Sequence, residues 1–279
     1  MILAADLENT TLLLGGLEDG EIRFRARLAA DRQRTEDQYA LELGGIMGLY
    51  GFDPRQAQGA ILSSEVPQLT QAVRQALGRL TGKKVLLVGP GLKNGLRIRT
   101  DDPAQLGSDR VADAVAAVQR YPLPLCIVNL GTATTLSVVD RQGSYLGGAI
   151  MPGVQLAVEA LSHQAAQLPS IGLRRPGAVI GRNTVDSMVS GALYGAASMI
   201  DGMVDRVREE LGLSPDETLT VIATGAMAGQ VAPLCRTPMQ EDPDLLLRGL
   251  WLIYQKNQRP RRSGEAAGCN MEEKKETLK

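Results

Sequence analysis

Two polar turns in this chain contain the residue types that hold phosphate groups. The first is "DLENT" at residues 6–10 and the second is "NLGTATT" at residues 129–135, and each follows an apolar run typical of a strand. Gly131 gives the second turn a flexible backbone, and the hydroxyls of Thr132 and Thr134 can donate hydrogen bonds. An ordinary threonine-rich hairpin has the same local pattern. Both interpretations, phosphate site and plain hairpin, remain open at this point.

A third polar segment, "LGSDR", can supply proton chemistry. Asp109 and Arg110 lie in a Gly/Ser turn directly before a predicted helix. Phosphoryl transfer uses a carboxylate to accept or orient the proton of the attacking hydroxyl, and a cation to anchor an anionic substrate. In an arbitrary sequence, an aspartate that caps a helix beside a solvated arginine is the commoner explanation.

The elements that would position these residues form a repeat. Residues 1–30 are predicted to form three strands, and the same order of strand, polar turn, strand, hairpin turn and strand begins again near residue 122. In this alignment Asp6 falls on Asn129 and Glu8 falls on Gly131. Helices are predicted near residues 35–50, 68–82, 110–121, 154–168, 187–211 and 242–257, and further strands near 59–67, 83–89 and 218–229. The repeat predicts an α/β fold of two similar halves whose polar turns face each other across a cleft.

Composition argues against several classes of function. The net charge is -1 and aromatic residues make up 3% of the chain, so a nucleic-acid partner is not expected. Cys126, Cys235 and Cys269 form no CxxC pair, and His163 is the single histidine, which argues against a thiolate or histidine metal site. No apolar run is long enough to span a membrane and the N-terminal segment is too polar for a secretion signal, so a cytoplasmic location is expected.

Taken in order, the motifs of this chain resemble those of the type III pantothenate kinases. They are "DLENT", "SSEVP", "PGL", "PAQLGSDR", "NLGTATT", "GGAIMPG", "GRNT" and "TGAMA", and the resemblance extends to Asn257. It implies duplicated ribonuclease-H-like domains of the actin-like ATPase type with a central cleft, in agreement with the repeat. We expect the first half at residues 1–120 and the second, which would form a dimer interface, at 121–257. Residues 258–279 contain almost no apolar residues and are predicted to be a disordered tail.

The resemblance also implies an activity, which is phosphorylation of pantothenate with ATP and Mg²⁺ by a homodimer. Asp109 would be the general base, within a pantothenate site of Gly107, Ser108, Asp109, Arg110 and Thr184. Asp6 would position Mg²⁺ through water, and Asn129 would mark a weakened site for K⁺ or NH₄⁺. The implied nucleotide-binding residues are Asp6, Leu7, Glu8, Asn9, Thr10, Thr11, Leu12, Leu13, Gly131, Thr132 and Thr134.

Five positions depart from the family pattern. Glu8 replaces a glycine, and its carboxylate would repel phosphate unless a cation bridges the two or the side chain turns to solvent. Asn129 and Ser137 each replace an aspartate, Ala226 adds a methyl group near the expected nucleotide, and Thr100 replaces a tyrosine near the substrate pocket. These departures leave a second hypothesis open: a catalytically impaired homologue that acts as a partner subunit or a regulatory binding protein.

Overall fold

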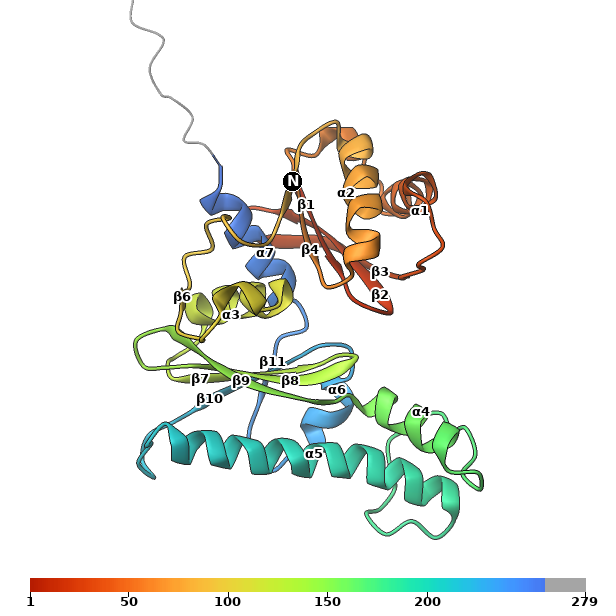
Figure 1. Ribbon diagram of the computed structural model, residues 1–279, viewed down its shortest axis with the longest axis vertical. Coiled ribbons are helices and arrows are strands. Elements are labelled where there is room, and N and C mark those ends of the chain that lie inside the picture. Colours follow the sequence, from red (N-terminus) through yellow and green to blue (C-terminus); the bar gives the residue numbers. More distant parts are fainter. Residues whose placement is uncertain (259–279) are drawn as a thin grey trace, which may run out of the picture.

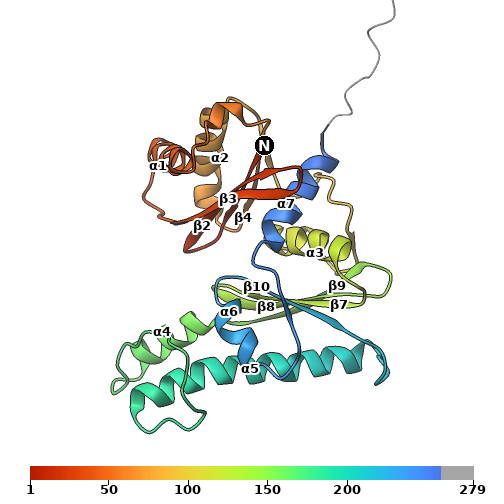
Figure 2. The same cartoon turned by 180° about the vertical axis from the view of Figure 1, so that it is seen from behind.

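The structure is a computed structural model that describes residues 1–258. It consists of two β-sheets in separate layers, with helices α3 (Ser108–Arg120) and α7 (Leu245–Lys256) between them in both views (Figures 1 and 2). The predicted tail lies outside the described residues except for Gln258. No helix in residues 1–258 combines the length and the apolar character needed to cross a bilayer.

The first sheet contains β1 (Ile2–Leu7), β2 (Thr11–Glu18), β3 (Glu21–Ala29), β4 (Ala60–Ser64) and β5 (Val85–Leu87), in the spatial order β3-β2-β1-β4-β5. Its central strand β1 pairs antiparallel with β2 and parallel with β4. All six residues of β1 are buried, because helices cover both faces of the sheet.

The second sheet repeats this topology. It contains β7 (Leu125–Leu130), β8 (Ala133–Val139), β9 (Ser144–Pro152), β10 (Thr220–Thr224) and β11 (Gln240–Glu241), ordered β11-β10-β7-β8-β9, with the short β6 (Arg97–Ile98) beside β9. Its central strand β7 pairs antiparallel with β8 and parallel with β10. Asp6 and Asn129 are both the fifth residue of a six-residue central strand. The repeat predicted from sequence, and the duplicated ribonuclease-H-like α/β fold, are therefore confirmed.

The outer helices complete the layers. Helices α1 (Glu36–Leu49) and α2 (Pro67–Thr81) pack on the first sheet, and α5 (Thr184–Glu210) and α6 (Ala228–Val231) pack on the second, beside α4 (Val154–Gln164). Three single-turn helices, η1 (Pro54–Gln56), η2 (Pro103–Gln105) and η3 (Ala232–Leu234), lie in the connections. Helix α4 ends four residues before its predicted end, and α5 begins three residues before its predicted start.

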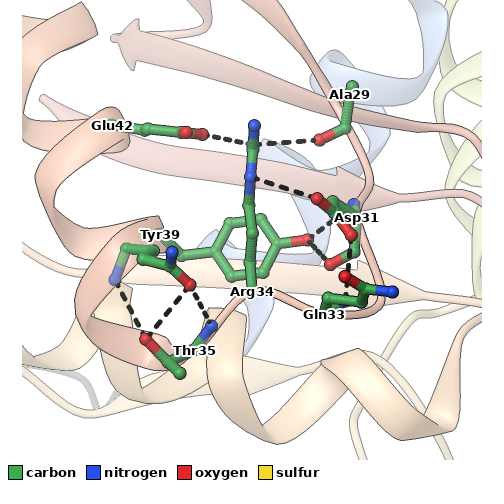
Figure 3. A network of polar contacts seen from close by, with 8 residues as sticks. Ala29, Asp31, Gln33, Arg34, Thr35, Tyr39 and Glu42 are labelled. Carbon is green, nitrogen blue, oxygen red and sulfur yellow. Dashed lines mark hydrogen bonds and ion pairs between the residues drawn. The ribbon is translucent and has the colours of Figure 1, made fainter.

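The connection from β3 into α1 is held by a network of polar contacts (Figure 3). Thr35 caps α1 through a capping box, in which side chain and backbone groups bond reciprocally across the first turn. The Tyr39 hydroxyl accepts the Asp31 N–H at 3.1 Å and donates to the Asp31 carbonyl at 3.0 Å. Arg34 pairs with Glu42 and also with the Asp31 carboxylate. These contacts fix the path by which the chain leaves β3 for α1.

Helix α7 packs close to the start of the chain although it comes at the end of the fold. Its apolar residues join a buried cluster with β1, β4 and α3. A Cβ atom at Gly249 of α7 would overlap the backbone carbonyl of Ala112 in α3, so only glycine permits this close crossing. The division of the chain at residues 120 and 121 remains a prediction; α7 follows that boundary in sequence, yet it packs against strands of the first sheet.

Candidate functional site

The turns that follow β1 and β7 face each other, as the repeat predicts. The hydroxyl oxygens of Thr10 and Thr132 lie 3.4 Å apart across the gap. A Cβ atom on Gly131 would lie 3.9 Å from Glu8 Oε1, so the Glu8 carboxylate also points toward the second turn. Both threonines are exposed, and their hydroxyls are available to a ligand held between the turns.

Asp6 is a buried carboxylate without a hydrogen-bond partner in the structure. Its side chain is 1% exposed, and neither oxygen receives a hydrogen bond. Burial raises the pKa of Asp6 well above its ordinary value, and the negative charges of Asp109 and Glu8 raise it further. A buried carboxylate in this state needs a proton or a cation. The two free oxygens fit Mg²⁺, which commonly binds one or two protein carboxylates together with phosphate oxygens and water.

Helix α3 brings Asp109 close to the first turn, where its charge acts on Asp6 and Glu8. The hydroxyls of Ser63 and Ser108 lie 2.9 Å apart, and Ser108 Oγ accepts the backbone N–H of Ser64 at 3.0 Å, which joins the start of α3 to the end of β4. The N-cap of α3 is Gly107, so the interpretation of Asp109 as an N-cap is wrong. Asp109 Oδ1 is buried and has no hydrogen-bond partner.

Glu65 is a neighbour of Asp109 that sequence reasoning did not single out. A Cβ atom on Gly107 would lie 2.5 Å from Asp109 Oδ1 and 3.3 Å from Glu65 Oε1, so both carboxylates flank this glycine. Partial burial and the Asp109 carboxylate raise the pKa of Glu65 to about 8, although this residue is exposed to solvent. A charged residue directly after the buried strand "AILSS" was the available signal.

Asp113 is a second residue that sequence reasoning missed. Asn129 Nδ2 donates a hydrogen bond of 3.0 Å to Asp113 Oδ2, while Asp113 Oδ1 has no partner. Asp113 is 2% exposed, and burial together with the Asp109 charge raises its pKa well above the ordinary value. A lone acidic residue in the apolar helical run "VADAVAAV", four residues after Asp109, was the signal. A carboxylate from α3 therefore lies beside the amide at position 129.

Arg110 is held by neutral groups. Its Nε donates to Ser137 Oγ at 3.3 Å, its Nη2 donates to the Leu136 carbonyl at 3.4 Å, and its guanidinium carbon lies 5.9 Å from the centre of the Tyr145 ring. Ser137 Oγ also lies 3.1 Å from the Tyr145 hydroxyl. Within residues 1–258 Arg110 forms no ion pair, so its positive charge is available to an anionic ligand.

Within one chain, Thr184 lies apart from Asp109 and Arg110. It is the exposed first residue of α5, which Asn183 caps, so its own interpretation as an N-cap is wrong. Thr184 borders a hollow of about 610 Å³ lined also by Leu161, Gly181 and Arg182. None of the residues that surround Asp109 lines this hollow.

The other residues predicted to bind the nucleotide differ in the polar groups that they can present to it. Leu7 and Leu12 are fully buried in the core and Leu13 is partly buried, which leaves backbone groups as their polar contribution. Asn9 is exposed, and the Thr11 hydroxyl donates to Glu8 Oε2 at 3.1 Å. Thr134 is completely buried, and its hydroxyl has no partner.

The two remaining departures from the family pattern are Ala226 and Thr100. Ala226 lines a hollow of about 430 Å³ between β3 and the loop after β10, together with Arg25, Arg27 and Glu241. The preceding Gly225 has φ +92°, which favours glycine. The Thr100 hydroxyl is buried without a hydrogen-bond partner. Among the described residues, no three His, Cys, Asp or Glu side chains come together as a set of metal ligands.

A family model and two related proteins each match most of this chain. A family model described as type III pantothenate kinase matches residues 2–206. A type III pantothenate kinase from Brevibacillus brevis is 40% identical over 258 residues, which are 92% of this chain and 100% of the relative. One from Moorella thermoacetica is 39% identical over 257 residues, with the same shares of both chains.

Two solved structures agree with the fold. A protein from Campylobacter jejuni, described as a Baf family transcriptional activator, superposes with a TM-score of 0.58 at 18% identity and covers 91% of this chain and 98% of its own. Component A of (R)-2-hydroxyglutaryl-CoA dehydratase from Acidaminococcus fermentans gives a TM-score of 0.53 at 14% identity, with 91% and 96% covered. At these identities the likeness concerns the fold alone.

Proposed function

The chain belongs to the type III pantothenate kinase family, and from this premise we propose that it phosphorylates pantothenate with ATP, the first step of coenzyme A synthesis. The observation that supports this most strongly is the arrangement of the cleft. Two polar turns from the repeated strands meet there, and Asp109 stands beside them at the start of α3. A phosphate donor and a hydroxyl acceptor can therefore be held next to one carboxylate.

In this mechanism Asp109 accepts the proton of the primary hydroxyl of pantothenate as that oxygen attacks the γ-phosphorus, and the bond from this phosphorus to the bridging oxygen breaks to release ADP. Arg110, which has no carboxylate partner within the described residues, anchors the substrate carboxylate, with Gly107 and Ser108 beside it. Thr10 and Thr132 donate hydrogen bonds to the phosphates from the two sides of the cleft. The protein's main contribution is to position the reactants and to neutralise charge. Asp6 would hold Mg²⁺, which offsets the negative charge of the phosphates.

A monovalent cation at position 129 would meet different ligands in this chain from those that an aspartate would supply. Asn129 offers a neutral carbonyl oxygen, and the nearest carboxylate is that of Asp113, 3.0 Å from its amide nitrogen. We therefore propose that K⁺ or NH₄⁺ activates the enzyme more weakly than an aspartate at position 129 would allow.

The separation of Thr184 from Asp109 supports a homodimer. Within one chain Thr184 lines a hollow that Asp109 and Arg110 do not line, and a second copy could bring Thr184 to the acceptor site. The second half exposes apolar side chains on β9, on α4 and before α5: Ile150, Leu156, Leu161, Val179 and Ile180. We propose this face as the dimer interface. The free thiols of Cys126 and Cys235 agree with a reducing, cytoplasmic location.

A coupled ADP-release assay tests the activity, with pantothenate, ATP and Mg²⁺, and with or without K⁺ or NH₄⁺. We expect pantothenate-dependent turnover that falls by about 10²- to 10⁴-fold in Asp109→Asn. An absence of turnover with every cation, from a protein that still binds pantothenate in calorimetry, would contradict the proposal and favour a partner subunit or regulatory binding protein.

A further inference from the structure

The Glu8 side chain is partly buried and directed toward the opposite turn instead of turning to solvent. Its backbone N–H donates to the Thr11 carbonyl at 2.9 Å, and its Oε2 accepts the Thr11 hydroxyl at 3.1 Å, so backbone and side chain are both held by their own turn. The other oxygen, Oε1, is directed toward Gly131 of the opposite turn. Either a side chain turned to solvent or a bridging cation could reconcile Glu8 with a phosphate ligand. The observed position of the side chain argues against the first, which leaves the bridging cation.

Asp6 and Glu8 face the same space. Along β1, Leu3, Ala5 and Leu7 pack into the core formed with α1 and α2. Ile2 and Ala4 pack on the opposite face, against α3 and α7. Because side chains alternate along a strand, Asp6 continues the face toward α3, and the charge of Glu8, which directly follows β1, acts on Asp6. Asp6 is 1% exposed and has two oxygens without partners, so a buried group with unmet bonding capacity points into the space that Glu8 borders.

Within residues 1–258, no Lys or Arg side chain forms an ion pair with Asp6 or Glu8. Arg27 on β3, whose charge acts on Glu8, is exposed to solvent. Two carboxylates with free oxygens, next to a site for phosphate, match the coordination of Mg²⁺, which takes one or two carboxylates and completes its octahedron with phosphate oxygens and water.

We propose that Glu8 joins Asp6 as a second carboxylate ligand of the divalent cation that accompanies the nucleotide. This inference rests on the proposed use of ATP. It assigns to Glu8, a departure from the family pattern, the role of strengthening cation binding. One consequence is that the cleft retains a divalent cation even before the nucleotide arrives.

Binding of Mn²⁺, a paramagnetic substitute for Mg²⁺, tests this directly. The full chain is titrated with Mn²⁺, with and without a non-hydrolysable ATP analogue, and free Mn²⁺ is measured by electron paramagnetic resonance. We expect Glu8→Gln to weaken Mn²⁺ binding about tenfold or more, and Asp6→Asn to weaken it at least as much. Glu21→Gln is the matched control, because Glu21 is an exposed carboxylate on β3 without an ion pair, and it should bind Mn²⁺ as the wild type does.

Unchanged Mn²⁺ binding in Glu8→Gln would contradict this inference. If Glu8 only repels phosphate, Glu8→Gln binds Mn²⁺ as well as the wild type does and binds the ATP analogue more tightly, and the inference is wrong. The measurement needs no pantothenate. A chain that loses Mn²⁺ affinity in Glu8→Gln but never phosphorylates pantothenate would support the ligand role and overturn the proposed function. Pantothenate turnover with unchanged Mn²⁺ affinity in Glu8→Gln would do the reverse.

Discussion

The two halves share one topology but differ in where their negative charge comes from. The end of β1 and the turn after it carry their own carboxylates, Asp6 and Glu8. The turn after β7 has Asn129 and Gly131 at the equivalent positions, and its nearest carboxylate, Asp113, comes from α3. The strands and the position of each turn are the same in the two halves, whereas the carboxylates come from different elements. The first turn is therefore suited to a cation, and the second to phosphate oxygens that accept hydrogen bonds.

Helix α3 connects these two unlike turns. Asp109 and Asp113 are four residues apart and lie on one face of the helix. Asp109 lies beside Glu65 at the end of the first sheet, and Asp113 accepts a hydrogen bond from Asn129 of the second. One helix thus positions a carboxylate beside residues of each half.

The largest effect on this arrangement is expected where α3 crosses α7. Gly249→Ala places a methyl group against the Ala112 carbonyl, and forcing atoms into a closely packed crossing should lower the free energy of unfolding by about 2 to 3 kcal/mol. Urea unfolding measures this. Gly45→Ala on the exposed side of α1, where a Cβ atom has nothing within 4 Å, is the control and should be neutral or stabilising. Equal midpoints for the two variants would show that the crossing tolerates the methyl group.

Exchanging the charges tests whether the position of the carboxylate matters in the second half. Asn129→Asp alone puts a second carboxylate beside buried Asp113 and removes their hydrogen bond, which should cost about 1 to 3 kcal/mol of stability. The double variant Asn129→Asp with Asp113→Asn restores one carboxylate and one amide, and most of the stability should return. A double-mutant cycle by chemical denaturation measures the coupling. Simple additivity of the two single changes would mean that the pair does not interact.

The smallest expected effect is a pH dependence of stability from Glu65. The pKa of this carboxyl is raised to about 8 in the folded chain, so the folded state keeps a proton that the unfolded state releases near the ordinary pKa of 4.5. Stability should therefore fall as pH rises from about 4.5 to about 8, and then become constant. Solvent at the exposed side chain reduces the size of the change. In Glu65→Gln this contribution should disappear, which unfolding curves collected across that range would reveal; an identical slope in both proteins would contradict it.

Sequence reasoning was most successful where the pattern is local. Strand alternation, glycine turns and the internal repeat predicted both central strands and the equivalence of Asp6 with Asn129, because these depend on neighbouring residues. The two-residue strands β6 and β11 have no periodicity to detect. Glu65 and Asp113 were missed because their roles depend on contacts with residues 44 and 16 positions away in the chain, respectively. Such contacts follow from how α3 packs, which no local pattern encodes. The roles assigned to the site residues and the domain boundary stay predictions.

The position of α7 has a consequence for biosynthesis. One face of β1 and β4, including Ile2, Ala4 and Ile61, is buried by α3 and by α7, which is translated after both sheets. The apolar face is therefore not fully covered until α7 has emerged from the ribosome, and the first sheet cannot complete its core before then. Contacts between residues so far apart in a chain form slowly, because a long loop must close before they contribute any stability. During that interval the nascent first sheet is a natural substrate for chaperones that recognise exposed apolar strands.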